Sequence, residues 1–253
     1  MINDIDTIIL AGSVTKGPLE ECVSADYEAL ISIEGKTMVE YVVEALKQTG
    51  RINRIVIVGP PDELSPLFHD EVIHIVPCGS SIDENVLLGM EFLNKDGWVL
   101  IASSDIPLLT PVAVNDFLDN CTEEADFYYP VVTRDSIERA FGDIKRTYVN
   151  IYEGMFTGGN ILLFKSAVAQ KSLEKGRELI NLRKSPLKLA GVLGLGFLLK
   201  FVTRSLKIAE AEKVVSRLLG VQGRAVISEF PEIGVDVDKP ADLEIVSKKI
   251  KSF

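Results

Sequence analysis

Histidine is almost absent from this chain, and its cysteines are few and scattered. Only His69 and His74 occur in 253 residues, and neither lies near a serine or cysteine in the context of a nucleophile. The three cysteines, Cys22, Cys78 and Cys121, form no C-x-x-C pair. The sequence therefore favours neither a Ser-His-Asp or Cys-His enzyme nor a zinc site built from histidine and cysteine.

Positive charge is also in deficit. The chain has 27 Lys and Arg against 37 Asp and Glu, a formal net charge of −10. Broad nucleic-acid binding needs a basic face that displaces counterions from phosphates, so we expect no nucleic-acid partner. A small anionic substrate held by a few local donors is compatible with this charge. Unpaired cysteines and the lack of a signal peptide after Met1 predict a reducing, cytoplasmic environment.

No hydrophobic run has the length of a membrane span. The most apolar stretch, residues 187–202, has sixteen residues and includes Lys188 and Lys200, whereas a spanning helix needs about 20 apolar residues. Three interpretations are open: a helix buried in the core, a contact between two copies in a homodimer, or an interfacial helix that touches a lipid surface. The buried helix is favoured over membrane contact.

Apolar strand patterns alternate with amphipathic helical patterns in the first half of the chain. Strands are predicted at 6–11, 54–58, 72–76 and 99–102, and helices at 37–48, 83–93 and 110–121, the last with Thr110 as N-cap and Pro111 at the first helical position. Nearly continuous apolar strands that alternate with helices indicate parallel βαβ units. The expected fold is α/β, a Rossmann-like, mostly parallel sheet with helices on both faces.

The pattern changes after residue 126. Short strands are predicted at 126–132, 147–152 and 160–164, helices at 166–180, 185–203 and 209–219, a last strand at 224–229 and a closing helix at 240–250. The short, turn-linked strands indicate a small antiparallel addition. Without an internal repeat or a low-complexity linker, we expect one domain over residues 1–253, with 126–220 as a subregion.

Two acidic segments follow apolar strands. Asp105 follows the strand at 99–102 after two serines, with Pro107 restricting the turn behind it, and Asp238 follows Asp236 in the stretch GVDVDKP. Ligands gather at the carboxyl ends of parallel strands, and carboxylates there can hold Mg²⁺. The alternative is that Asp105 and Asp238 cap the helices that follow them. Two such strand ends in one chain favour a shared metal site, with Asp236 as an alternative ligand.

The first strand runs into a glycine turn. Gly12 lets backbone N–H groups approach a phosphate, and Lys16 can supply positive charge. The segment is neither a Walker loop nor a complete G-x-G-x-x-G, so it predicts neither of those nucleotide sites.

Taken in order, these segments resemble the MobA-like NTP transferases. Residues 10–12 (LAG) are similar to the start of that family's glycine-rich signature, and 33–41 (IEGKTMVEY) to its G-K-P segment. Residues 104–107 (SDIP) match its metal-binding D-x-P, and 236–243 (DVDKPADL) are close to its ending. The resemblance covers nearly the whole chain and implies a fold of the nucleotide-diphospho-sugar transferase type.

The resemblance also implies an activity: transfer of NMP from an NTP to a phosphorylated small-molecule acceptor, with release of pyrophosphate and dependence on Mg²⁺. It implies that 126–220 lies on the acceptor side. By the same resemblance, the nucleotide-binding residues are Leu10, Ala11, Gly12, Ser13, Gly79, Ser80, Asn85 and Ser104, the metal ligands Asp105 and Asp238, the acceptor-binding residues Thr157, Gly158, Gly159 and Asn160, and the catalytic cations Lys16 and Arg146. Arg146 is suited to a forked phosphate contact, and the equal alternative is a solvated surface charge.

Two departures from the family pattern leave alternatives open. Ser13 stands where the second signature glycine is usual, and Glu28 stands where a phosphate-neutralising lysine is usual. Either Lys16 or Lys36 replaces that lysine, or the chain is a catalytically weakened nucleotide-binding relative. A third interpretation is a nucleotide-sugar-dependent glycosyltransferase of similar fold, because residues 236–238 spell its D-x-D motif.

Overall fold

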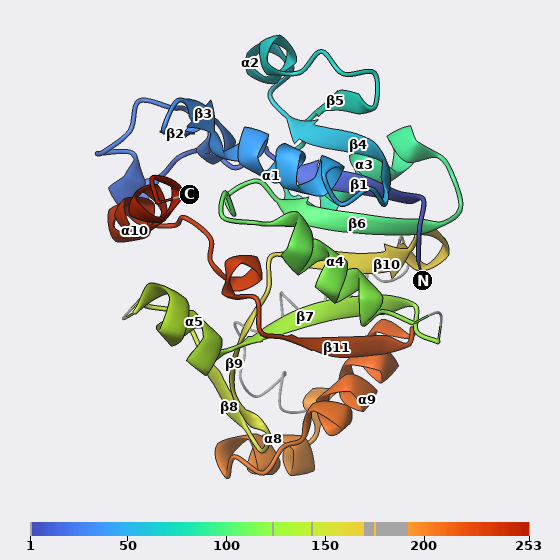
Figure 1. Ribbon diagram of the computed structural model, residues 1–253. Helices are drawn as coiled ribbons and strands as arrows, with labels where there is room; N and C mark the ends of the chain where they lie inside the picture. The colour runs from blue at the N-terminus through green and yellow to red at the C-terminus, as the bar shows by residue number, and fades with distance from the viewer. Residues whose placement is uncertain (1, 123, 143, 170–174, 176–191, 253) are drawn as a thin grey trace.

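Strands from both halves of the chain join into one mixed sheet (Figure 1). The computed structural model describes residues 2–122, 124–142, 144–169, 175 and 192–252. Their strand order is β5-β4-β1-β6-β10-β7-β9-β8, with β11 paired to β7. The bounds are β1 (Ile5–Leu10), β4 (Ile52–Gly59), β5 (Ile73–Pro77), β6 (Trp98–Ser103), β7 (Phe127–Thr133), β8 (Val149–Ile151), β9 (Gly154–Gly158), β10 (Ile161–Lys165) and β11 (Gly223–Ser228); β2 (Ser32–Ile33) and β3 (Lys36–Thr37) form a separate hairpin.

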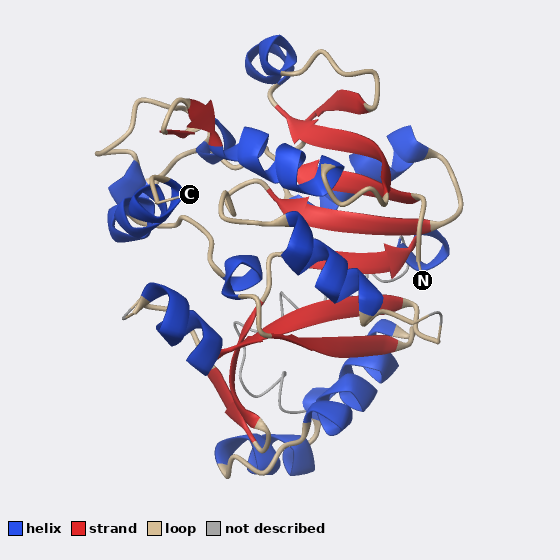
Figure 2. Cartoon of the chain, viewed as in Figure 1, coloured by secondary structure: helices blue, strands red, loops and turns tan. Residues whose placement is uncertain are grey.

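Helices flank the sheet, as Figure 2 shows. They are α1 (Met38–Lys47), α2 (Pro61–Leu64), α3 (Ile82–Leu93), α4 (Pro111–Asp119), α5 (Arg134–Phe141), α8 (Leu195–Val202), α9 (Ile208–Leu219) and α10 (Pro240–Ile250), with short 3₁₀ helices at Gly17–Leu19, Glu28–Leu30, Ser65–Leu67, Ser166–Val168 and Pro231–Gly234. The α4 prediction is confirmed in detail, since the Thr110 hydroxyl accepts a hydrogen bond from the Ala113 amide at 3.1 Å.

Strands β5, β4, β1 and β6 are parallel to one another, and their side chains pack into a core layer on each face of the sheet. Successive residues of a strand point to opposite faces. Ile5 and Ile9 of β1 therefore pack in the core layer that holds α1 and α4, whereas Ile8 packs in the layer that holds α3. The predicted α/β sheet with helices on both faces is confirmed, and its apolar strands are explained by burial on two sides.

The second half of the sheet differs from the prediction in one strand. β10 is antiparallel to β6 and β7, which confirms the antiparallel addition, and β11 returns parallel to β7. No strand is predicted between 152 and 160, but residues 154–158, which include Thr157 and Gly158, form β9, which pairs with β7 and β8. A glycine-rich sequence has low intrinsic strand propensity, and here the ladder hydrogen bonds outweigh it.

Helix α5 was not predicted from the sequence. It has only eight residues, and its apolar residues, Ile137, Ala140 and Phe141, have helical spacing over a single turn, which is too short to identify a helix from the sequence. The usable signal was its N-cap: the hydroxyl of Thr133 accepts a hydrogen bond from the Ser136 amide at 3.2 Å.

The predicted helices at 166–180 and 185–203 lie partly outside the described residues. Within the described part of the second, Leu195, Leu199 and Val202 of α8 are exposed and none of the helix is buried, so the core interpretation is wrong there. Figure 1 places α8 beside the ends of β8 and β9, away from the parallel half of the sheet. Among the described helices, none has the length and apolar character needed to cross a bilayer. Membrane contact and contact between two copies stay predictions.

Gly89, in α3, tests how tightly this helix packs on the sheet. A Cβ there would lie 2.9 Å from Cδ1 of Ile8, which is fully buried. We predict that Gly89→Ala lowers the free energy of unfolding by about 1–2 kcal/mol, because overpacking outweighs the better helix propensity of alanine. Gly196→Ala in α8 is the control, since no described atom lies within 4 Å of its added Cβ. The control should match or exceed wild-type stability in urea denaturation, and an equal loss in both variants would contradict the prediction.

Candidate functional site

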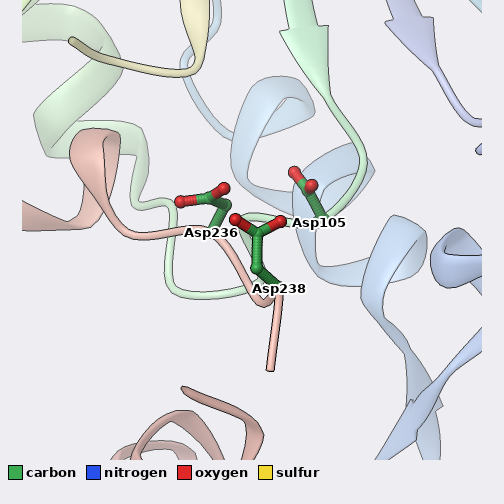
Figure 3. Close-up of side chains that lie close together, drawn as sticks. All are labelled: Asp105, Asp236 and Asp238. Carbon is green, nitrogen blue, oxygen red and sulfur yellow. The ribbon is translucent and has the colours of Figure 1, made fainter. Parts of the chain in front are cut away.

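Three carboxylates converge at the carboxyl end of the parallel strands. Asp105 follows β6, whereas Asp236 and Asp238 precede α10, and one ligand atom from each lies within 4.8 Å of the other two. Figure 3 shows the three side chains gathered at one place from two distant segments. We call these three residues the acidic cluster. The structure thus brings together the two aspartates singled out by the sequence and places Asp236, the alternative ligand, beside them.

Backbone contacts and alternation explain this convergence. The amide of Val237 donates a hydrogen bond to the carbonyl of Asp105 at 2.9 Å, which joins the two segments directly. Val235 and Val237 are fully buried, so the aspartates between and after them are directed away from the core. The hydroxyl of Ser103 also hydrogen-bonds the Asp105 carboxylate.

Neither Asp105 nor Asp238 caps a helix, so the capping interpretations are wrong. Thr110 caps α4. The start of α10 is capped from inside the helix by Asp242, whose carboxylate accepts hydrogen bonds from the amides of Asp238 at 3.3 Å and Lys239 at 3.1 Å. The carboxylates of Asp105 and Asp238 are therefore left available to other partners.

The electrostatics of the acidic cluster favour a proton or a cation. Burial raises the pKa of Asp105 to about 7, against the opposing effect of the Ser103 hydrogen bond, and the charges of Asp236, Glu28 and Asp238 raise it further. Burial also raises the pKa of Asp236, and Arg146 opposes this rise. Carboxylates this close repel one another when all are ionised, so the site binds positive charge favourably.

Arg146 supplies one positive charge at the cluster. Its side chain is only 8% exposed, so the interpretation as a solvated surface charge is wrong. Nη1 contacts the Asp236 carboxylate, and Nη2 contacts the backbone carbonyl of the same residue. Nε is buried without a hydrogen-bond partner among the described residues.

The glycine turn after β1 packs against the loop after β5. A Cβ on Gly12 would lie 2.6 Å from Cβ of Cys78 and 3.2 Å from Nδ2 of Asn85, so only glycine fits there. The Asn85 side chain accepts a hydrogen bond from the Gly79 amide at 2.7 Å, and this residue is 7% exposed. Asn85 therefore positions the loop through its carbonyl oxygen, and Gly12 follows the end of β1, which pairs with the end of β6 that leads to Asp105.

The other predicted nucleotide residues differ in exposure. Ala11 and Ser104 are buried, Leu10 is half-buried and Ser13 is exposed. Ser80 is tied to Glu84 through its amide at 2.7 Å and its hydroxyl at 2.8 Å.

Residues 13–15 pair with residues 26–28 through backbone hydrogen bonds. Lys16 follows the first of these segments, and Glu28 ends the second. Lys16 is exposed just before the 3₁₀ helix at Gly17–Leu19. The amide of Glu28 donates to the Ser13 carbonyl at 3.0 Å, and its charge acts on Asp105. The family departure at Glu28 therefore adds negative charge near the acidic cluster.

The predicted acceptor segment packs against Ile233, in the 3₁₀ helix that precedes Asp236. The Asn160 amide and side chain both donate to the carbonyl of Ile233, at 2.9 and 3.2 Å. A Cβ on Gly159 would lie 2.7 Å from Cγ2 of Ile233, and one on Gly158 would lie 2.1 Å from the hydroxyl of Tyr129.

Tyr129 is the residue that sequence reasoning missed at this site. Its hydroxyl lies against Gly158, and burial first and the Asp236 charge second raise its pKa. Its neighbour Tyr128 is buried on the opposite face of β7. The available signal was this alternation, which places adjacent tyrosines on different faces of a strand.

Comparison with known proteins fits this geometry. A family model described as the MobA-like NTP transferase domain matches residues 26–182, more than half of the chain. The chain belongs to this family. The matched range includes Glu28, Asp105, Arg146 and the segment 157–160, but it ends before Asp236 and Asp238. In this MobA-like NTP transferase, the fold brings those two aspartates to Asp105.

Solved structures extend the likeness over nearly the whole chain. A hypothetical transferase from Thermus thermophilus is 38% identical and has a TM-score of 0.84, covering 95% of this chain and 99% of that one. A 4-diphosphocytidyl-2C-methyl-D-erythritol synthase from Anaerococcus prevotii is 10% identical with a TM-score of 0.61, over 98% and 99% of the two chains, and shows the shared fold alone.

A curated relative matches over a shorter range. The 2-C-methyl-D-erythritol 4-phosphate cytidylyltransferase of Klebsiella pneumoniae is 30% identical over 115 residues, which are 44% of this chain and 49% of that protein. The chain therefore spans about half the length of this curated relative.

The raised pKa of Asp105 predicts a pH dependence of stability. A folded-state pKa of about 7, against 3.8 as the ordinary value, means that the folded protein binds the proton more tightly than the unfolded chain. The stabilisation is present below about pH 4 and is lost as the pH rises through 7. We predict that stability measured in EDTA falls from pH 5 to pH 8, and that Asp105→Asn removes about 1–2 kcal/mol of this fall.

Urea denaturation at both pH values checks this prediction. Asp96→Asn, in an exposed turn, is the matched control and should keep the wild-type fall. An undiminished fall in Asp105→Asn would show that the Asp105 carboxyl does not titrate in this range.

Proposed function

We propose that the protein is a nucleotidyltransferase that transfers NMP from an NTP to a phosphorylated small-molecule acceptor and releases pyrophosphate. The observation that carries the proposal is the convergence of Asp105 and Asp238, with the glycine turn at the same end of the parallel strands, in a member of the MobA-like NTP transferase family. The Klebsiella relative, a cytidylyltransferase named for a phosphorylated methylerythritol, supports a phosphorylated acceptor.

The donor set of the acidic cluster fits Mg²⁺. All three residues offer carboxylate oxygens, the hard ligands that Mg²⁺ prefers, and such sites use one or two carboxylates together with substrate phosphates. Asp105 and Asp238 would hold the cation, and Asp236 is the third candidate ligand. When bound, Mg²⁺ neutralises charge on phosphate oxygens.

The chain's own residues would bind and orient the nucleotide. Backbone amides of the glycine turn would lie along the phosphates, where the missing Cβ of Gly12 permits close approach. The loop at Gly79 and Ser80, positioned by Asn85, would lie against the base. Lys16 is exposed on the segment after the turn and would reach the phosphates from outside.

The acceptor would bind on the side of β7 and β9. The segment 157–160, the Tyr129 hydroxyl and Arg146 line this side, and an arginine forms forked contacts with phosphate oxygens. In the reaction, an acceptor phosphate oxygen forms a bond to the α-phosphorus of the NTP. The bond from that phosphorus to the oxygen that bridges it to the β-phosphorus breaks. Pyrophosphate leaves with the electron pair. Positioning and charge neutralisation supply the rate enhancement.

A nucleotide-sugar glycosyltransferase is the alternative that the Asp236-x-Asp238 pair supports. The family match and the name of the curated relative favour nucleotidyl transfer over it. Calorimetry against each NTP and a panel of UDP-sugars distinguishes the two, and preferential binding of a UDP-sugar would reverse the ranking.

We predict that Asp105→Asn and Asp238→Asn each reduce pyrophosphate release by a hundredfold or more, because each removes a charged ligand of the cation. The assay combines purified protein with Mg²⁺, each NTP and a panel of phosphorylated acceptors. Asp96→Asn controls for loss of one surface carboxylate, and circular dichroism checks that all variants fold. No pyrophosphate from the wild type across the panel, together with no NTP-dependent thermal shift, would overturn the proposed function.

Glu28→Lys tests whether the chain is a weakened relative. The charge of Glu28 acts on Asp105, so we expect lysine there to strengthen NTP binding by about tenfold through loss of repulsion and gain of attraction. Glu20→Lys makes the same charge change at an exposed position and controls for net charge. Equal NTP affinities for the two variants, measured by calorimetry, would show that Glu28 does not face the phosphates.

A further inference from the structure

Arg146 is a buried cation held by a residue of the acidic cluster. Its two Nη atoms contact the carboxylate and the backbone carbonyl of Asp236, whose own side chain is 21% exposed. Because Arg146 contacts both the carboxylate and the main-chain carbonyl of Asp236, it holds the backbone at Asp236 as well as the side chain. The guanidinium therefore neutralises part of the cluster's negative charge from within the fold.

A divalent cation and the Arg146 guanidinium would compete for the carboxylate of Asp236. The Asp236 carboxylate lies within 4.8 Å of ligand atoms of Asp105 and Asp238, so a cation held by the cluster would be a near neighbour of Arg146. Two positive charges at such a separation repel strongly outside bulk water. Because coupling between two binding events is reciprocal, a cation weakens the Arg146–Asp236 pair and the pair weakens cation binding.

Arg146 also retains a hydrogen-bond donor without an acceptor. Its Nε is buried and has no partner among the described residues. A buried donor left unsatisfied is unfavourable, so the contacts with Asp236 do not complete the hydrogen bonding of this side chain. Anionic oxygens of a phosphate are the acceptors that an arginine binds most effectively.

We propose that Arg146 is an internal counter-cation of the acidic cluster, that a divalent cation displaces it from Asp236, and that the displaced guanidinium then binds a phosphate oxygen of the acceptor. This inference rests on the proposed function and deepens it. It couples the two ligands: the cation binds first and makes the acceptor-binding group available.

The first test measures cation binding. Isothermal titration with MgCl₂ and with MnCl₂ should give about tenfold tighter binding for Arg146→Met than for the wild type, because the competing charge is gone. Arg139→Met removes an arginine that is 72% exposed and paired with Glu229, and should bind the cations as the wild type does. Wild-type binding with no gain in Arg146→Met would overturn the inference alone. No cation binding by the wild type would overturn the metal site of the proposed function as well.

The second test uses inorganic phosphate as the probe. Mg²⁺ should strengthen phosphate binding to the wild type, and Arg146→Met should lose most of this gain. A gain of equal size in both proteins would overturn the transfer of the guanidinium to a phosphate.

Thermal unfolding separates this role from a structural one. Arg146→Met should melt well below the wild type in EDTA, and the deficit should shrink when Mg²⁺ replaces the missing counter-charge. An equal deficit in both conditions would mean that Arg146 only supports the fold. Arg146→Lys keeps the charge without the two-pronged contact, so it should bind the cations more tightly than the wild type, and this comparison holds even where Arg146→Met does not fold; an affinity equal to that of the wild type would contradict the inference.

Discussion

The hydrogen bond from the Val237 amide to the Asp105 carbonyl is the contact on which the candidate site depends. It joins the loop after β6 to the segment before α10, and the burial of Val235 and Val237 fixes which way the intervening aspartate is directed. With the backbones held this closely, the three carboxylates lie near one another. The chemistry of the site thus follows from a main-chain contact, because side-chain attraction alone would not bring like charges together.

Gathering three acids is unfavourable for the folded protein unless positive charge accompanies them. Burial and mutual repulsion raise the pKa of Asp105 to about 7, and Arg146 opposes the same effect at Asp236. The parallel half of the sheet, with isoleucine and valine side chains packed on both faces, supplies the stability that tolerates such a cluster. Carboxyl groups with pKa values raised in this way are typical of functional sites, and their arrangement is consistent with a place for a cation.

Much of the architecture could be predicted from the sequence, because apolar periodicity and helix caps are local. The parallel strands, Thr110 as a cap and the α10 boundaries follow from such signals. Strand β9 could not be predicted, because its glycines gain strand structure only from pairing with β7 and β8. The buried-helix interpretation is wrong for α8 for a related reason: hydrophobicity indicates that a helix prefers burial, but it does not say which surface covers it, and Leu195 and Leu199 are exposed.

At the site, local signals specify the residue types and their position at strand ends: the glycine turn, Asp105 before a proline, and alternating valine and aspartate near the C-terminus. The folded chain brings Asp236 together with Asp105 and Asp238, buries Arg146 against Asp236, and sets the Tyr129 hydroxyl against Gly158. The two kinds of information differ in range. Caps and periodicity act over a few residues, whereas these contacts join positions far apart in the chain and depend on how the sheet brings its strand ends together.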